Sequence, residues 1–304
     1  MPQRVVVVGA GIVGLTCAMR LLESGHRVDV LARDLPLETT SSVAAAIWYP
    51  YLAFPQDRVT AWGRAAYAEF ARQAADGVDG VVIRRGTELM RDPTPDPSWI
   101  DAVRGLHRVS PPEPYADAWS FVTPVIDMPR YLARLTDRVM DAGGTITRMA
   151  LARLPQAPLV VNCSGLGSRL LAEDSSTTPV RGQVVVVEQF GLEEWWLGEE
   201  VAGDVPTYVI PRTSDVVLGG TDDVGQWSRT PSAAVAEDIL RRAAALVPAV
   251  ADAQVLRHRV GLRPARPEVR LERVGDVIHC YGHGGSGVTL SWGCADEVLA
   301  LAET

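Results

Sequence analysis

The chain has 304 residues, of which 47% are hydrophobic and 22% are charged, so it can bury a large core and fold as one or two domains. Its net charge of −8 argues against nucleic acid and anionic membrane surfaces as partners and favours small molecules. All 29 basic residues are arginine, which excludes the catalytic lysine of pyridoxal phosphate enzymes and the lysine of a P-loop.

The four cysteines show no Cys-x-x-Cys spacing and stand among apolar or small residues, so we expect reduced, structural thiols and no metal site. The sequence shows neither the pattern of a signal peptide nor an apolar run approaching the ~20 residues of a membrane span. These features predict a cytoplasmic protein.

The first segment predicts a strand, a helix and a second strand. Residues 4–8 are mostly valine and end at a glycine, which is typical of a strand buried on both faces of a parallel sheet. Apolar residues then recur at helical spacing over residues 12–22, and Gly25 stands where a left-handed cap ends a helix. Residues 27–32 predict a second strand, which completes a unit of the ~30 residues expected for this motif.

Between the first strand and the helix lies the pattern Gly9-x-Gly11-x-x-Gly14. The first glycine allows a tight turn, the second lets the backbone approach a pyrophosphate, and the third lets the helix pack on the strand. The start of the helix supplies free amides and a positive dipole end. In this context the pattern predicts a dinucleotide site.

Further helices and strands are predicted along the chain, without an internal repeat. Residues 92–114 are rich in proline and interrupt any regular α/β alternation. The predicted helices are residues 62–73, 129–142, 233–246 and a final helix running toward residue 301. The predicted strands are residues 81–83, 159–163, 183–188, 208–211, 215–218 and a strand starting at residue 277.

Glycine-rich segments follow predicted strands at three distant points of the chain, in residues 9–14, 165–167 and 282–287. One nucleotide-binding fold that is interrupted and resumed would bring them to the same edge of a sheet. We therefore predict an α/β protein whose Rossmann-like dinucleotide-binding domain is discontinuous in sequence. Residues 1–53, 124–180 and 257–304 are expected to form this domain. Residues 54–123 and 181–256 are expected to form a second, α+β substrate-binding domain on a mostly antiparallel sheet.

The residues by themselves leave the dinucleotide open between NADP and FAD. Arg33, just after the second strand, is suited to the 2′-phosphate of NADP. Asp34 follows slightly after the position at which an acidic residue usually contacts the ribose. Three glycine clusters favour FAD, because an extended FAD needs backbone contacts at its adenine, its pyrophosphate and its isoalloxazine. The final helix, beginning after Gly284 and Gly285, would set its positive end and the Thr289 hydroxyl against an electron-accepting ring.

Several segments resemble the D-amino-acid oxidase family, to which the D-aspartate oxidases are closely related. The most specific are residues 261–267 (GLRPARP) and 279–289 (HCYGHGGSGVT). Matching segments follow in the same order, so the likeness covers nearly the whole chain; they are residues 43–51, 96–99, 161–165, 181–183 and 218–228. The resemblance favours FAD over NADP.

The resemblance implies noncovalently bound FAD, hydride transfer from Cα of a D-amino acid to flavin N5, and reoxidation by O2. The products would be a 2-oxo acid, ammonia and hydrogen peroxide. Arg263 would grip the substrate carboxylate with its planar fork, Tyr208 would donate to the same carboxylate, and the Gly285 carbonyl would accept from the amine. The implied FAD contacts are Gly9, Gly11, Ile12, Val13, Gly14, Arg33, Asp34, Ser41, Ser42, Val43, Ala44, Ala45, Val161, Ser164, Gly165, Gly284, Gly285, Ser286, Gly287, Val288 and Thr289.

The substrate end of the predicted pocket departs from the family. Tyr49 replaces a common glutamine, Ser286 replaces a common tyrosine, and residues 203–206 hold no aromatic lid residue. D-aspartate oxidases place an arginine after the Gly-Gly-Thr segment, where this chain has Asp222, which would repel a second carboxylate. We expect neutral D-amino acids as substrates, with basic ones left open. The alternatives are an oxidase of glycine or secondary amines, or a D-aspartate oxidase, and the oligomeric state stays open between a monomer and a homodimer.

Overall fold

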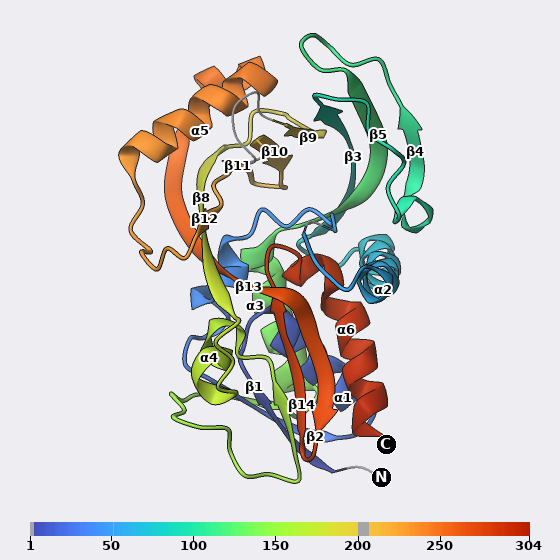
Figure 1. Cartoon of the computed structure of the whole chain (residues 1–304), viewed down its shortest axis with the longest axis vertical. Coiled ribbons are helices and arrows are strands. Elements are labelled where there is room, and N and C mark those ends of the chain that lie inside the picture. The colour runs from blue at the N-terminus through green and yellow to red at the C-terminus, as the bar shows by residue number, and fades with distance from the viewer. Residues whose placement is uncertain (1–2, 51, 200–206) are drawn as a thin grey trace.

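The computed structural model describes residues 3–50, 52–199 and 207–304. The molecule is elongated, with one lobe at the bottom and one at the top of Figure 1. Within the described ranges a single 14-stranded sheet continues through both lobes. Both chain ends lie in the lower lobe.

The lower lobe is built on parallel strands. They lie in the order β6 (Thr145–Arg148), β2 (Arg27–Ala32), β1 (Arg4–Val8), β7 (Leu159–Asn162) and β14 (Val277–His283), and each neighbouring pair is parallel. Val5 and Val7 of β1 belong to the large core that includes the helices, whereas Val6 and Val8 pack with Val160 in a separate cluster. Burial of both faces explains the run of valines.

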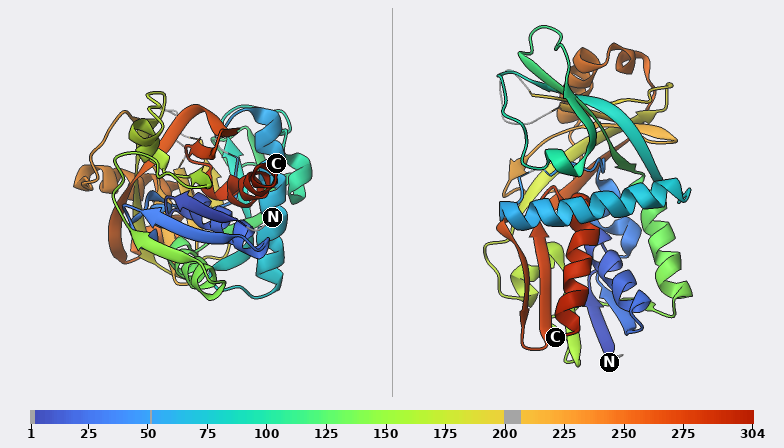
Figure 2. Two further views of the ribbon diagram at one scale, coloured as in Figure 1. Left: turned by 90° about the horizontal axis from the view of Figure 1, so that it is seen from below. Right: turned by 90° about the vertical axis from the view of Figure 1, so that its right-hand side faces the viewer.

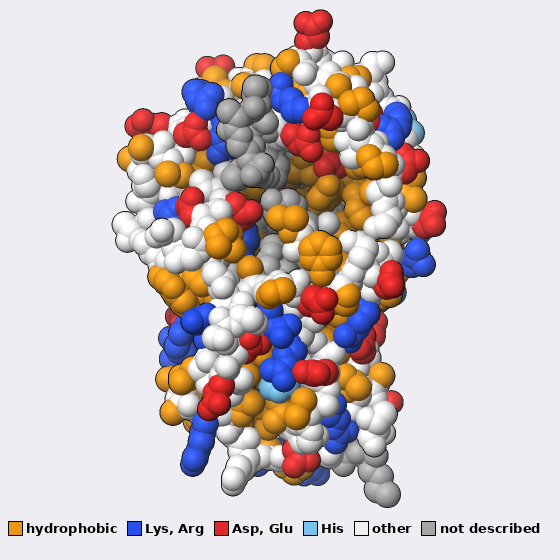
Figure 3. All heavy atoms as spheres, in the orientation of Figure 1, with side chains coloured by type: hydrophobic (Ala, Val, Ile, Leu, Met, Phe, Trp, Pro, Cys, Tyr) orange, Lys and Arg blue, Asp and Glu red, His pale blue; other side chains and the backbone are white. Residues whose placement is uncertain are grey.

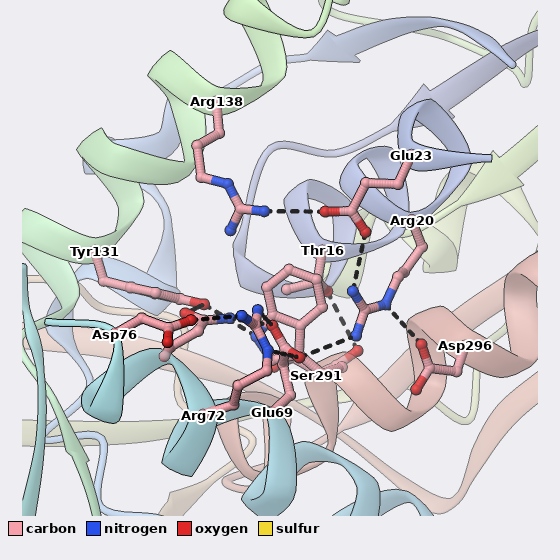
Figure 4. Close-up of polar contacts among 12 residues, drawn as sticks. Thr16, Arg20, Glu23, Glu69, Arg72, Asp76, Tyr131, Arg138, Ser291 and Asp296 are labelled. Carbon is pink, nitrogen blue, oxygen red and sulfur yellow. Dashed lines mark hydrogen bonds and ion pairs between the residues drawn. The ribbon is translucent and has the colours of Figure 1, made fainter. Parts of the chain in front are cut away.

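A helical layer packs on this lobe, formed by α1 (Ile12–Glu23), α3 (Met128–Asp141) and α6 (Gly287–Ala302). The long helix α2 (Gln56–Ala75) crosses α6 at the waist of the molecule, as the right-hand view of Figure 2 shows. Arg20 of α1 fastens three helices together, because it pairs with Glu69 of α2 at 3.5 Å and with Asp296 of α6 at 2.7 Å (Figure 4). Its guanidinium also lies over the Trp292 ring, 4.4 Å from the centroid.

The upper lobe is mostly antiparallel. Its strands follow in the order β4 (Arg104–Arg108), β5 (Asp117–Ile126), β3 (Val81–Met90), β9 (Trp195–Gly198), β10 (Thr207–Pro211), β11 (Asp215–Gly219) and β8 (Thr178–Glu188), with the short β12 (Asp223–Val224) also paired to β8. The β3–β9 pair is parallel. α5 (Ala233–Leu246) packs Ile239 and Ala243 into the same cluster as Val185 and Val209 of the sheet.

One long strand, β13 (Val255–Val274), joins the two lobes. Its first half pairs with β8 and its second half with β14, both in antiparallel register. Pro264 and Pro267 stand at or next to the register shift between Ala265 and Arg270, where the missing N–H groups of proline are tolerated. The sequence pattern did not predict this strand, because prolines and a bulge interrupt its alternation.

The remaining elements are short. They are α4 (Ser168–Leu171) and the 3₁₀ turns Pro36–Glu38, Thr40–Val43, Ile100–Ala102, Gly165–Gly167 and Pro248–Asp252.

The predicted α/β class, with a Rossmann-like part and a mostly antiparallel sheet, is confirmed. The helix predicted over residues 62–73 begins earlier, at Gln56, and the proline-rich residues 92–114 contain the edge strand β4. In the part of the chain that the structure describes, no helix combines the length and the apolar character that a membrane span requires.

Candidate active site

A cavity of about 1570 Å³ lies where the two lobes meet, at the carboxyl ends of β1 and β7. It is lined both by the glycine segments of the parallel strands and by side chains of the antiparallel sheet. Figure 3 shows this face hollowed near its middle, with apolar side chains in the hollow and acidic ones beside it. The end of a parallel sheet is where nucleotide ligands bind in such folds.

The first glycine loop is shaped by close approach of backbone to backbone. Gly9 has φ +112°, and a Cβ there would lie 2.4 Å from the Cys163 carbonyl oxygen. A Cβ on Gly14 would lie 2.0 Å from the Gly9 carbonyl oxygen, so only glycine lets α1 begin this close to β1. Ser41 closes the loop from the other side, because its Oγ accepts from the Ile12 amide at 3.1 Å.

These features fit an extended dinucleotide such as FAD. The loop at the start of α1 presents backbone instead of side chains, as a pyrophosphate requires. Ser164 also lines the cavity, and its buried Oγ has no hydrogen-bond partner within the described ranges. At the end of β2, Arg33 pairs with Asp34 at 2.6 Å, and the hydrogen bond from Arg33 lowers the pKa of Asp34. Because Asp34 balances the charge of Arg33, the case for a 2′-phosphate is weakened.

The second end of the cavity is formed by the turn from β14 into α6. The Gly284 amide donates to the Pro264 carbonyl at 2.9 Å, which ties this turn to β13. Gly284, Gly285 and Val288 line the cavity at the start of α6. Thr289 instead fixes the neighbouring segment, because its Oγ1 accepts from the Tyr49 amide at 3.1 Å and donates to the Tyr49 carbonyl at 2.9 Å.

Arg263 of β13 and Tyr208 of β10 come together across the sheet in a pocket made by glycines. A Cβ on Gly182 would lie 2.6 Å from Nη2 of Arg263, and a Cβ on Gly219 would lie 2.1 Å from Cζ of Tyr208. Nη1 of Arg263 donates to the Thr221 carbonyl at 2.8 Å and to Oδ1 of Asp222 at 2.6 Å. Burial raises the pKa of Tyr208, and the nearby charge of Arg263 opposes that rise.

A buried arginine of α5 supports this pocket from behind. Arg242 donates to the Gly220 carbonyl at 2.9 Å and to Oγ1 of Thr207 at 2.7 Å. These bonds hold the residue before Tyr208 and the residue after Gly219 in place. Arg242 therefore fixes the position of Tyr208 through Thr207 on the same strand and through Gly220 just after the neighbouring strand β11.

Most of the predicted site residues line the cavity. They are Gly9, Gly11, Ile12, Val13, Gly14, Arg33, Asp34, Ser41, Val43, Ala44, Ala45, Tyr49, Ser164, Gly165, Tyr208, Asp222, Arg263, Gly284, Gly285, Gly287 and Val288. Four others lie behind its wall: Ser42 accepts from Arg259, Thr289 holds Tyr49, and Val161 and Ser286 are fully buried. The predicted lack of an aromatic lid at residues 203–206 falls outside the described residues.

Sequence reasoning missed several residues of this cavity. Glu88 and Leu197 line it from strands of the upper lobe, and Trp227 and Arg229 also line it, with Arg229 close enough to Asp34 to lower the pKa of that carboxyl. Trp227 is 55% exposed, an unusual position for such a large apolar side chain. Glu88 lies in the part of β3 beyond the strand predicted over residues 81–83, and the sequence pattern there gave no signal for a cavity position.

The four cysteines are free and gather beneath the first glycine loop. The Sγ atoms of Cys17 and Cys163 are 3.9 Å apart. Donor atoms within 4.8 Å of one another form two overlapping groups, Cys17 with Cys163 and Cys280, and Cys280 with His283 and Cys294. Burial raises the pKa of Cys294, which favours a neutral thiol packed as a small apolar side chain.

The fold and the cavity define a class of protein. The chain belongs to the FAD dependent oxidoreductase family, whose sequence profile matches residues 4–301. FAD is therefore the dinucleotide for which this cavity is built.

Similarity to individual proteins of this family indicates which of its members this chain resembles. The chain is 49% identical to a D-amino-acid oxidase of Rubrobacter xylanophilus, over 98% of this chain and 95% of that protein. It is 42% identical to a D-amino-acid oxidase of Streptomyces coelicolor, over 98% and 96%, and 38% identical to the D-aspartate oxidase of Homo sapiens, over 98% and 94%. The fold is similar to that of glycine oxidase from Geobacillus kaustophilus, with a TM-score of 0.83 at 21% identity over 99% of this chain and 95% of that one. The predicted resemblance to the D-amino-acid oxidase family is confirmed.

Proposed function

We propose that this protein oxidises D-amino acids to 2-oxo acids and ammonia, using noncovalently bound FAD, with O2 as the acceptor and hydrogen peroxide as the second product. The observation that carries the proposal is that Arg263 and Tyr208 lie together in a cavity that the glycine loops of the dinucleotide-binding lobe also line. Identity of 49% to a D-amino-acid oxidase over nearly the whole chain supports it.

The chain's own residues bind and orient the substrate in this proposal. The planar fork of Arg263 binds the substrate carboxylate, and the hydroxyl of Tyr208 donates to it. The Gly285 carbonyl, at the turn before α6, accepts from the amine. With both groups fixed, the Cα–H bond is held toward the flavin, which supplies the hydride acceptor when bound.

Two other activities of the superfamily are weaker candidates. Glycine oxidase shares the fold, but the identity of 21% supports the fold alone. D-aspartate oxidase is 38% identical, yet Asp222 lies 2.6 Å from the guanidinium of Arg263 and opposes a second carboxylate beside it. Asp222 therefore favours substrates without a second carboxylate, which are the neutral and the basic D-amino acids. A cytoplasmic location is supported by four free thiols.

The test is the initial rate of peroxide release by the purified holoenzyme over a panel of D-amino acids, L-amino acids, glycine and sarcosine. We expect turnover of D-alanine and D-valine, together with anaerobic bleaching of the yellow protein by D-alanine. Faster turnover of L-amino acids, of glycine or of D-aspartate would contradict the proposal.

A further inference from the structure

We infer that Glu88 forms a subsite for a positively charged substrate side chain, so that D-amino acids with a cationic group on a long aliphatic stem are preferred substrates. The inference rests on the proposed function and specifies its substrate class. Three observations carry it: the alignment of Glu88 with the carboxylate-binding residues, an unpartnered carboxylate oxygen, and the charges around it.

Glu88 stands in register with Tyr208 on the same face of the sheet. Glu88 of β3 pairs with Leu197 of β9, and Leu197 pairs with Tyr208 of β10. Residues paired directly across strands project from the same face, and all three line the cavity. Two interstrand spacings separate the Glu88 and Tyr208 backbones by roughly 10 Å.

The three paired residues Tyr208, Leu197 and Glu88 match, in this order, the carboxylate, the aliphatic stem and the charged end of a long basic amino acid. A substrate held by its carboxylate at Arg263 and Tyr208 meets an apolar side chain, Leu197, along its stem. It then reaches the carboxylate of Glu88 at its far end. An aliphatic stem covers apolar surface while its charged head finds a polar partner, as lysine and arginine side chains do.

The Glu88 carboxylate has one satisfied oxygen and one unsatisfied oxygen. Oε1 accepts from the Tyr49 hydroxyl at 2.6 Å. Oε2 is buried and lacks a hydrogen-bond partner within the described ranges, and none of the ion pairs found there involves Glu88. A buried acceptor without a donor is unfavourable, and an ammonium or guanidinium group would supply one.

The surroundings of Glu88 add negative charge. Burial raises the pKa of Glu88 to about 7. The hydrogen bond from Tyr49 opposes this rise, and the negative charge of the nearby Glu199 adds to it. The nearby cation, Arg91, is directed elsewhere: its Nε donates to the Glu199 carbonyl at 3.2 Å, and its guanidinium lies 4.5 Å from the Tyr115 ring centroid. None of the ion pairs among the described residues neutralises this carboxylate, and a cationic substrate group would do so.

The test compares matched charged and uncharged substrates in three forms of the holoenzyme. The wild type, Glu88→Gln and Glu199→Gln are assayed for kcat/KM with D-lysine, D-arginine and the uncharged D-norleucine. Glu88→Gln keeps the shape and the hydrogen bond to Tyr49 but removes the charge. Glu199→Gln removes an equal charge from an exposed position at the same end of the cavity.

We expect the wild type to prefer D-lysine or D-arginine over D-norleucine by about tenfold or more, the size of effect that a buried charge pair produces. Glu88→Gln should lose that preference while retaining D-norleucine turnover within about threefold. Glu199→Gln should lower the preference by no more than about threefold, because Glu199 is exposed and acts on the cationic group only at longer range. A binding readout accompanies the rates: 6-aminohexanoate and hexanoate, which lack the α-amine and are not oxidised at Cα, are titrated against the visible spectrum of the bound flavin. The wild type should bind 6-aminohexanoate more tightly, and Glu88→Gln should not.

The outcomes separate this inference from the proposed function. Turnover of D-norleucine without a preference for the basic substrates, or an unchanged preference in Glu88→Gln, overturns the subsite and leaves D-amino-acid oxidation intact. Absence of turnover with every D-amino acid, together with Glu88-dependent binding of 6-aminohexanoate, overturns the proposed function and supports the subsite.

Discussion

Oδ1 of Asp222 accepts a hydrogen bond from Nη1 of Arg263 at 2.6 Å, so the arginine assigned to the substrate carboxylate already carries an acidic partner. Both side chains are only about one-quarter exposed, at 23% for Arg263 and 22% for Asp222. In such a setting the pair is screened less than a surface ion pair. In the proposed binding mode, the substrate carboxylate would share the guanidinium with Asp222.

Replacing Asp222 by asparagine should tighten substrate binding. The amide keeps a hydrogen-bond acceptor for Arg263 and removes the competing charge, so we expect KM for D-alanine to fall by about three- to tenfold. The gain for D-aspartate should be larger, because its second carboxylate no longer meets a like charge. Steady-state kinetics on both substrates check this, and a higher KM in the variant would show that Asp222 serves to position Arg263.

Removing the Arg263 side chain should abolish substrate binding without releasing the cofactor. Arg263→Ala is expected to lose about 2–5 kcal/mol of substrate binding, because the buried carboxylate loses its charged partner. Flavin content should stay near wild type, since Arg263 is assigned to the substrate, whereas the loop at Gly9 to Gly14 is assigned to the cofactor. Arg263→Lys is the matched variant. Its affinity for substrate should lie between those of the wild type and Arg263→Ala, because an ammonium keeps the charge but cannot bind both carboxylate oxygens as a planar guanidinium does. Near-normal turnover of D-alanine by Arg263→Ala would refute the assigned role.

Two alanine substitutions in the first glycine loop should differ sharply. A Cβ at Gly14 would meet a backbone oxygen at 2.0 Å, whereas a Cβ at Gly11 would meet the movable Ser41 Oγ at 3.1 Å. We expect Gly14→Ala to lower the free energy of unfolding of the apoprotein by about 1–3 kcal/mol, because helix and strand must move apart. Gly11→Ala should leave apoprotein stability nearly unchanged and weaken FAD binding. Urea unfolding and flavin titration measure the two effects, and equal stabilities would argue against the backbone contact.

The preference for basic substrates should depend on pH through Glu88. Burial, with the nearby Glu199, raises the pKa of this carboxyl to about 7, against the hydrogen bond from Tyr49. Glu88 is therefore mostly neutral at about pH 6 and mostly ionised at about pH 8. The ratio of kcat/KM for D-lysine to that for D-norleucine should rise across this interval. In Glu88→Gln the ratio should be flat, and a slope that survives the substitution would assign the titration to another group.

The helical layer of the lower lobe gives a stability prediction. Arg20 lies over Trp292 and bridges Glu69 and Asp296, with a side chain 19% exposed. We expect Arg20→Ala to reduce the free energy of unfolding by about 1–3 kcal/mol through lost packing and stranded carboxylates. Arg72→Ala is the control, because Arg72 also contacts Glu69 but is 57% exposed and should change stability by less than about 0.5 kcal/mol. Chemical denaturation at low ionic strength compares them, and equal losses would contradict the argument.

The local parts of this fold could be predicted. The strand over Arg4–Val8, the helix over Ile12–Glu23 and the strand over Arg27–Ala32 follow from valine runs, helical spacing and glycine caps within a few residues of one another. β13 could not, because its prolines interrupt the alternation on which strand prediction depends. The edge strand β4 could not be predicted for a similar reason, because it lies within a proline-rich segment.

The sequence by itself indicated the dinucleotide loop and, through its resemblance to a family, led us to expect that Arg263 and Tyr208 form a carboxylate site. These inferences depend on short motifs whose chemistry is set by neighbouring residues. Only the tertiary structure decided that Glu88 faces the same cavity and that Asp222 contacts Arg263 directly. Such relationships arise from strand order and register, which bring residues from distant parts of the chain onto one face of a sheet, and no local pattern encodes that neighbourhood.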